Sequence, residues 1–341
     1  NDALFDLGTG IVIIGAPGVE ASSISMLSPT TIDGAPLTLV GPARIDIASG
    51  VTGTFDAQIA GSGGLQVGTF GPGRVILRAE NTFAGTTIVT GNAWLGLESD
   101  NALGSTAEGT IVASGSTLAL GNIEVGNETI TLAGQGNPAS YGAIHVNNGL
   151  SPTLNGNVTN NGNATIGSAG TLTLRGTTNL GAPGDEMTLS ALPGGVILHD
   201  GALSGDGALV LSGGGSIALN AANTYLGETS ITNGTQVSTG AVNALPTANG
   251  RTQLLMDTTG TGGSRLDLSP AGQAVASLTG SSSSSIVLGT DDLLVGNGIG
   301  TDTPLIPATS FEGSIEGPGG VTKDGSSIQE LSGSNTFEGA T

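Results

Sequence analysis

The chain has 341 residues, including 61 glycines and no cysteine, and carries a formal net charge of -20. That charge excludes proteins that bind nucleic acid or anionic membranes through a basic stripe, and the lack of cysteine excludes disulfides and thiolate metal sites. A hydrophobic content of 37% is too high for a disordered chain, while 3% aromatic residues are few for a globular enzyme. The composition favours short strands joined by tight turns.

Short apolar runs bounded by glycine and proline follow one another from the start of the chain. The first four lie at 11–14, 24–27, 37–40 and 45–47. Runs of this length indicate strands, because helices need longer periodic stretches. The alternation is clearest from 59 to 134, where two apolar residues of each run fall on one face. The sequence therefore predicts an all-β protein.

The second half of the chain contains more turn residues. The segment 135–180 is rich in asparagine, above all at 146–149, 155–158 and 160–163. Asparagine tolerates left-handed backbone and can form amide ladders, so we interpret these stretches as corners of successive rungs. The best helical candidates are 99–103 and 270–278, and we expect no more than one or two helical turns. The serine run 281–285 is expected to be a loop or a solvated strand edge.

A motif of the form Asn-Thr-aromatic-x-Gly occurs three times. The residues that it fixes are Asn81, Thr82, Phe83, Gly85, Asn223, Thr224, Tyr225, Gly227, Asn335, Thr336, Phe337 and Gly339. Such a pattern between short apolar runs suits a recurring corner of a coiled β-ribbon, with the aromatic ring packed beside the asparagine. We therefore interpret these residues as structural, in a solenoid of on the order of 15 coils. An array of β-sandwiches is the structural alternative.

Each copy of the motif follows a glycine-rich strand lead-in, at 59–65, 203–209 and 315–321. The first two copies are followed by Asn101-Ala102-Leu103 and Asn243-Ala244-Leu245. These cassettes, near 59–104, 203–246 and 315–341, resemble the passenger-associated transport repeat of bacterial autotransporter passengers. The resemblance covers somewhat under half of the chain. It implies a right-handed parallel β-helix, one elongated domain over 1–341, displayed extracellularly on the outer surface of a Gram-negative bacterium.

The resemblance also implies a non-enzymatic stalk, adhesin or fibre without a cofactor. The 27 acidic residues allow weak calcium binding at the surface. Expected partners are other copies of the chain, stacked head-to-tail through open solenoid ends, or glycans and proteins of a host or neighbouring cell. Nucleic-acid binding and membrane insertion are not expected. The abrupt start at Asn1 and the third cassette, which stops at Thr341, suggest a mature or excerpted chain.

Two functional alternatives stay open. The first is a self-assembling filament or surface-layer subunit. The second is a polysaccharide-active β-helix enzyme, which as a hydrolase would need two carboxylates about 5–10 Å apart. Asp200 and Asp206 flank one turn and could converge, while Arg74 and Arg78 are the only close basic pair. No spacing typical of a metal site occurs, and the only histidines are His145 and His199.

Overall fold

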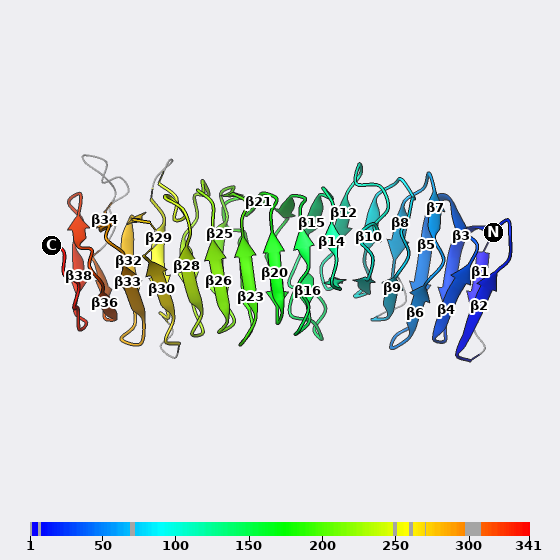
Figure 1. Cartoon of the computed structure of the whole chain (residues 1–341), viewed down its shortest axis with the longest axis horizontal. Coiled ribbons are helices and arrows are strands. Elements are labelled where there is room, and N and C mark those ends of the chain that lie inside the picture. Colours follow the sequence, from blue (N-terminus) through cyan, green and yellow to red (C-terminus); the bar gives the residue numbers. More distant parts are fainter. Residues whose placement is uncertain are drawn as a thin grey trace. The chain divides into compact units, whose positions relative to one another are not determined.

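The computed structural model describes residues 2–5, 8–68, 72–247, 251–258, 262–269, 271–296 and 308–341, which fall into two compact units. Unit 1 comprises Asn1–Gly176 and unit 2 comprises Thr177–Thr341. Each unit is a β-solenoid of stacked parallel strands, with about 14 turns in all. Within each unit, the strands of one sheet lie side by side in chain order (Figure 1). The predicted parallel β-helix is therefore confirmed as a fold class.

Unit 1 contains strands of three parallel sheets. The first sheet holds β1 (Asp2–Phe5), β3 (Val19–Met26), β5 (Leu37–Ile47), β7 (Ile59–Gly61), β8 (Leu65–Val67), β10 (Thr87–Val89), β12 (Thr110–Val112), β15 (Ile130–Leu132) and β18 (Val158–Asn160). The second holds β2 (Gly10–Ile14), β4 (Thr30–Gly34), β6 (Thr52–Phe55), β9 (Arg74–Leu77), β11 (Trp94–Leu97), β13 (Thr117–Leu120), β16 (Ile144–Val146) and β19 (Ala164–Ser168). The third holds β14 (Glu124–Val125), β17 (Thr153–Leu154) and β20 (Thr171–Leu174).

Unit 2 is built in the same way. One sheet holds β21 (Thr178–Asn179) and β24 (Leu203–Ser204), and another holds β22 (Glu186–Ala191), β25 (Ala208–Ser212), β27 (Thr229–Ile231), β29 (Gln253–Met256), β32 (Ser277–Gly280), β35 (Thr309–Phe311) and β38 (Gln329–Leu331). A further sheet holds β23 (Val196–His199), β26 (Ser216–Leu219), β28 (Gln236–Thr239), β30 (Arg265–Leu268), β33 (Ser285–Leu288) and β36 (Ser314–Glu316). The remaining strands are β31 (Ala274–Val275), β34 (Leu293–Val295) and β37 (Val321–Lys323).

Neither helical candidate forms a helix in the described residues. Residues 99–103 form turns, and 274–275 and 277–280 are the strands β31 and β32. Pro270 lies outside the described residues. The serine run 281–285 forms the turn that leads into β33, as expected. No helix in the described ranges is long and apolar enough to span a bilayer.

The core follows from the register of the parallel strands. In unit 1, Val75 pairs with Leu95, which pairs with Leu118, and Leu118 pairs with Ile144. All four side chains are fully buried. Alternate residues of a strand point to opposite faces, so residues that are paired in register point to the same face. Their apolar side chains therefore stack in rows through the interior. Each buried side chain contributes about 1.5–3 kcal/mol from removal of apolar area from water.

Candidate functional site

The first motif asparagine joins three successive turns of unit 1. Asn81 is buried, with 4% of its surface exposed. Its Oδ1 accepts a hydrogen bond from the backbone N–H of Ile59 at 2.8 Å, one turn before, and its Nδ2 donates to the carbonyl of Ala102 at 2.6 Å, one turn after. Because all polar atoms of the amide are matched to backbone groups, Asn81 satisfies groups that the sheets leave unpaired.

The second copy reproduces this geometry in unit 2. Asn223 is buried, accepts from the N–H of Leu203 at 2.7 Å and donates to the carbonyl of Ala244 at 2.6 Å. In the third copy, Asn335 is half-buried and accepts from the N–H of Ile315 at 3.0 Å, but it donates to Gly333 within its own turn. The lead-in and the trailing Asn-Ala-Leu of each full cassette are therefore the backbone partners of its asparagine.

The other motif positions divide into inward and outward residues. Phe83 and Tyr225 are fully buried and Phe337 is half-buried, so the aromatic ring lies on the same inward side as the asparagine two residues before it. The Tyr225 hydroxyl hydrogen-bonds to Thr229 at 2.6 Å, and burial raises the pKa of this phenol. The side chains of Thr82, Thr224 and Thr336 are exposed, and these residues bond to the preceding turn through their backbone N–H.

The motif glycine is required by close approach of two turns. A Cβ on Gly85 would lie 2.3 Å from the backbone N of Gly64, in the lead-in of the preceding turn. At Gly339 the corresponding distance to the N of Gly320 is 2.4 Å. No side chain fits between backbones at these separations, which explains why a glycine-rich lead-in accompanies each motif glycine.

The two carboxylates of the hydrolase alternative, Asp200 and Asp206, are exposed at the surface of unit 2. Asp200 directly follows β23 and accepts a hydrogen bond from Asn220 of the next turn at 2.7 Å. Asp206 lies between β24 and β25, and its backbone N–H donates to the carbonyl of Gly181 at 2.9 Å. Both are placed in the turns of the solenoid, as solvated turn carboxylates.

A different carboxyl group lies in the interior of unit 1. Glu128 is 2% exposed, and its Oε1 accepts a hydrogen bond from Thr110 Oγ1 at 2.6 Å. Its Oε2 has no protein partner in the part of the chain that the structure describes. Burial raises the pKa of Glu128, opposed by the hydrogen bond from Thr110. Sequence reasoning missed this residue, because Glu128 follows Asn127 in an ordinary polar turn sequence.

We expect Glu128→Gln to stabilise unit 1 at pH 8 by about 1 kcal/mol and to have little effect at pH 4. Because the folded-state pKa of Glu128 is raised, its contribution to stability is full below the unfolded pKa and is lost as the pH rises through the folded value. Urea unfolding followed by the emission of Trp94 measures the difference. Glu108→Gln, at an exposed position, is the matched control. Equal effects of the two substitutions at pH 8 would contradict the assignment.

An aromatic and cationic stack lies on the outward side of the second sheet of unit 1. Arg74 of β9 and Trp94 of β11 are register partners, and the guanidinium carbon of Arg74 lies 4.3 Å from the centroid of the Trp94 ring. The ring of His145, from β16, meets Trp94 edge-on at 4.6 Å and stacks against Tyr141 at 4.6 Å. We call Arg74, Trp94, His145 and Tyr141 the lateral stack.

Hydrogen bonds fix the tautomer of His145. The backbone N–H of Tyr141 donates to Nδ1 at 3.1 Å, so Nδ1 carries no proton. Nε2 then carries the proton and donates to Asn147 Oδ1 at 3.0 Å. Burial lowers the pKa of His145. The hydrogen bond to Asn147 opposes this lowering, whereas the charge of Arg74 adds to it. The imidazole is therefore neutral at physiological pH, and the amide of Asn147 has a defined orientation.

The segment 134–142 folds over the outside of the sheet and completes the lateral stack. Asn137 donates from its backbone N–H to Thr117 Oγ1 at 2.9 Å and from Nδ2 to the carbonyl of Asn92 at 2.7 Å. Thr117, although it is the register partner of Trp94, is fully buried under this segment. This segment is thus an excursion across the sheet, whereas the asparagine-rich stretches 147–149, 155–157 and 161–163 lie in the turns between strands, as predicted.

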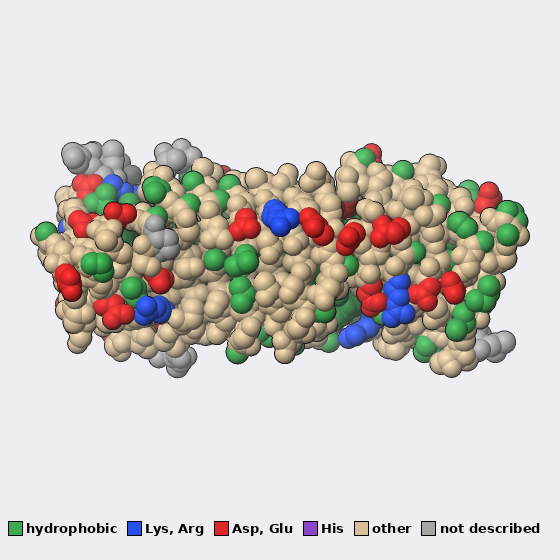
Figure 2. Space-filling view, in the orientation of Figure 1, with side chains coloured by type: hydrophobic (Ala, Val, Ile, Leu, Met, Phe, Trp, Pro, Cys, Tyr) green, Lys and Arg blue, Asp and Glu red, His purple; other side chains and the backbone are tan. Residues whose placement is uncertain are grey.

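A hollow of about 160 Å³ lies beside the lateral stack. Its floor includes Gly96 and Ala119, which are register partners on β11 and β13, and its walls include Trp94, Glu98 and Asn147. Arg78 forms an ion pair with Glu98, with 2.7 Å between Nε and Oε2, and a second one with Asp56, with 3.7 Å between Nη1 and Oδ1. In the part of Figure 2 that shows unit 1, basic side chains lie directly beside acidic ones. The hollow combines apolar surface with groups that donate and accept hydrogen bonds.

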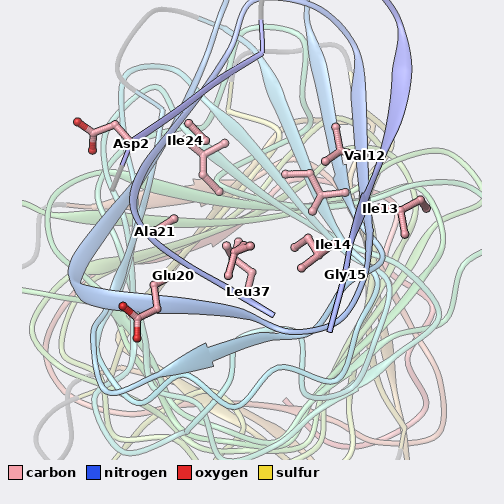
Figure 3. Close-up of a pocket in the computed structure, with 12 residues that line it drawn as sticks. Asp2, Val12, Ile13, Ile14, Gly15, Glu20, Ala21, Ile24 and Leu37 are labelled. Carbon is pink, nitrogen blue, oxygen red and sulfur yellow. The ribbon is translucent and has the colours of Figure 1, made fainter. Parts of the chain in front are cut away.

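A second hollow, of about 320 Å³, lies at the first turn of unit 1. Ile14, Ala21 and Leu37 point into it, whereas Asp2 and Glu20 point away (Figure 3). Nearby apolar side chains of β1 and β2 are exposed, namely Leu4, Ile11 and Ile13. In the ranges that the structure describes, no three His, Cys, Asp or Glu side chains gather as a metal site. Calcium binding therefore stays an untested prediction.

The chain matches no protein-family model, no curated protein and no solved structure. The β-solenoid that the autotransporter resemblance implies is present, whereas membership of that family stays a prediction.

Proposed function

We propose that the chain is a non-enzymatic segment of a secreted cell-surface protein and works as a rigid adhesive stalk. The observation that carries this proposal is the buried asparagine that joins three turns, built alike in both units at Asn81 and Asn223. These amides tie neighbouring turns together at points where the backbone would otherwise be unsatisfied. Resistance to slippage between turns is a property that a displayed stalk needs. The motif resemblance to autotransporter passengers supports display on a Gram-negative surface.

Beads coated with the purified chain test the adhesive role. We expect them to stay attached under flow to surfaces bearing cell-surface polysaccharide, while beads coated with a globular protein of similar charge wash off. A parallel wash with a calcium chelator shows whether surface calcium contributes. Equal loss of both kinds of bead would contradict adhesion. Release of new reducing ends from the polysaccharide would contradict the non-enzymatic assignment.

A second candidate function is self-association into filaments, which the apolar hollow at the first turn of unit 1 favours. Covering Ile11 and Ile13, each more than 60% exposed, would remove apolar surface from water. Negative-stain microscopy across protein concentration and calcium distinguishes the two functions. Long fibres one solenoid wide would favour the filament, whereas isolated particles at all concentrations would favour the stalk.

A further inference from the structure

Arg74 differs from every other arginine of this acidic chain. The other five each have a carboxylate oxygen within 4 Å, namely Arg44, Arg78, Arg175, Arg251 and Arg265. Arg74 has no such partner among the described residues and is instead held over the ring of Trp94. With 27 acidic residues and six arginines in the chain, an unpaired guanidinium on the surface needs an explanation.

Stacking on Trp94 leaves the guanidinium rigid and its donors free. A ring face attracts the delocalised cation without using its N–H groups, which project in the plane of the fork. That fork matches the two oxygens of a carboxylate, and a pre-oriented fork loses less entropy when the ligand binds. Arg74 is therefore suited to an anionic group that arrives from solvent.

The floor of the hollow beside Arg74 is kept low by a glycine that the fold does not require. A Cβ on Gly96 would meet Ile76 Cγ1 at 3.6 Å, which is ordinary contact, and the backbone of Gly96 is not left-handed. A side chain would therefore fit there, unlike at the motif glycines. What Gly96 provides, with Ala119 as its register partner, is an open and mostly apolar floor.

The walls of the hollow offer a free donor and a free acceptor. Asn147 Oδ1 is occupied by His145, which leaves the Nδ2 amide of Asn147 to donate. Glu98 Oε2 is occupied by Arg78, which leaves Oε1 to accept. Sugar hydroxyls both donate and accept, and the apolar face of a sugar ring packs on small and aromatic side chains. A volume of about 160 Å³ suits one ring of a longer chain better than a drug-sized ligand.

We propose that this hollow binds an acidic saccharide, with a sugar carboxylate on Arg74 and the sugar ring over Gly96 and Ala119. The inference deepens the adhesive role proposed above by naming the class of ligand, and it rests on that role for its biological meaning. Trp94 is the only tryptophan of the chain, so its emission reports on this site alone.

The test is a fluorescence titration of Trp94 with a galacturonate tetrasaccharide, repeated by calorimetry. We expect a saturable change in emission, with affinity about 10- to 100-fold weaker in Arg74→Ala, because a charge-assisted bidentate contact is lost. Gly96→Val fills the floor while leaving Arg74 on Trp94, and we expect it to abolish binding. Arg175→Ala removes the same charge directly after β20, which belongs to a different sheet of unit 1, and is expected to leave the affinity unchanged. Circular dichroism of each variant confirms that it is folded.

Two further probes separate the parts of the ligand. A neutral glucose tetrasaccharide lacks the carboxylate, and a tricarboxylate such as citrate lacks the ring; both should bind about tenfold more weakly. Equal binding of the neutral sugar, or unchanged affinity in Arg74→Ala, would overturn the proposal. Adhesion of coated beads with no response from Trp94 would overturn this inference alone. A saturable titration with beads that wash off would overturn the adhesive role alone.

Discussion

Asn81→Leu is expected to lower the free energy of unfolding of unit 1 by about 3–4 kcal/mol. Leucine has a similar volume, but it leaves the N–H of Ile59 and the carbonyl of Ala102 buried without partners. Each such group costs about 1–3 kcal/mol. Urea unfolding followed by Trp94 emission measures the loss, because Trp94 lies in β11 of the same unit.

Two variants of the same motif control this experiment. Thr82→Ala changes an exposed side chain whose residue bonds through its backbone, so we expect a change within about 0.5 kcal/mol. Asn81→Asp keeps the acceptor for Ile59 but loses the donor to Ala102, and it adds a buried charge. We therefore expect it to lower the free energy of unfolding at least as much as Asn81→Leu does. If Asn81→Leu behaved like Thr82→Ala, the amide would not join the turns.

Unit 2 is expected to lose up to about 3 kcal/mol of stability through His199 as the pH falls from 7 to 4. His199 is 1% exposed, and burial lowers its pKa to about 4, against the hydrogen bond to Gly201 and the charge of Asp200. Nδ1–H donates to the carbonyl of Gly201 at 2.8 Å, and Nε2 accepts from Thr178 Oγ1 at 2.9 Å. The neutral ring is thus fully satisfied.

The sign of this pH dependence follows from proton binding. Between the unfolded pKa near 6.5 and the folded value near 4, the unfolded state binds more protons, so stability falls as the pH is lowered through that window. His199→Gln keeps a neutral donor and acceptor. We expect this variant to be less stable than the parent at pH 7, and its free energy of unfolding to change less between pH 7 and pH 4. Chemical unfolding followed by circular dichroism at pH 7, 5.5 and 4 compares the two. Parallel pH profiles would show that His199 does not titrate in the window.

The fold class could be predicted from the sequence because it depends on local patterns. The run 118–120 has the alternation of a strand with one buried face, and the structure places Leu118 and Leu120 inward on β13. The failed helical candidate at 270–278 is instructive. Its alanines suit a helix locally, but pairing of β31 with β34 and of β29 with β32 decided the conformation.

The lateral stack could not be predicted, because it depends on contacts between distant residues. The sequence shows Arg74 only as one member of a close basic pair with Arg78, and His145 only as one of two histidines. Nothing local indicates that Asn137 reaches Asn92, although this bond holds the segment that brings Tyr141 onto His145. The role of Gly96 was hidden for another reason, since a glycine that opens a hollow and one that avoids a clash look the same in a sequence.

The asparagine that bonds to Ile59 and Ala102 also constrains how such a gene can change by duplication. A solenoid made of independent turns could gain or lose one turn by recombination and keep its register. A turn that carries a buried Asn81 depends on its neighbours, because its amide needs an unpaired backbone N–H in the turn before and an unpaired carbonyl in the turn after. We therefore expect such a turn to be duplicated together with both of its neighbours, as a triplet, rather than alone.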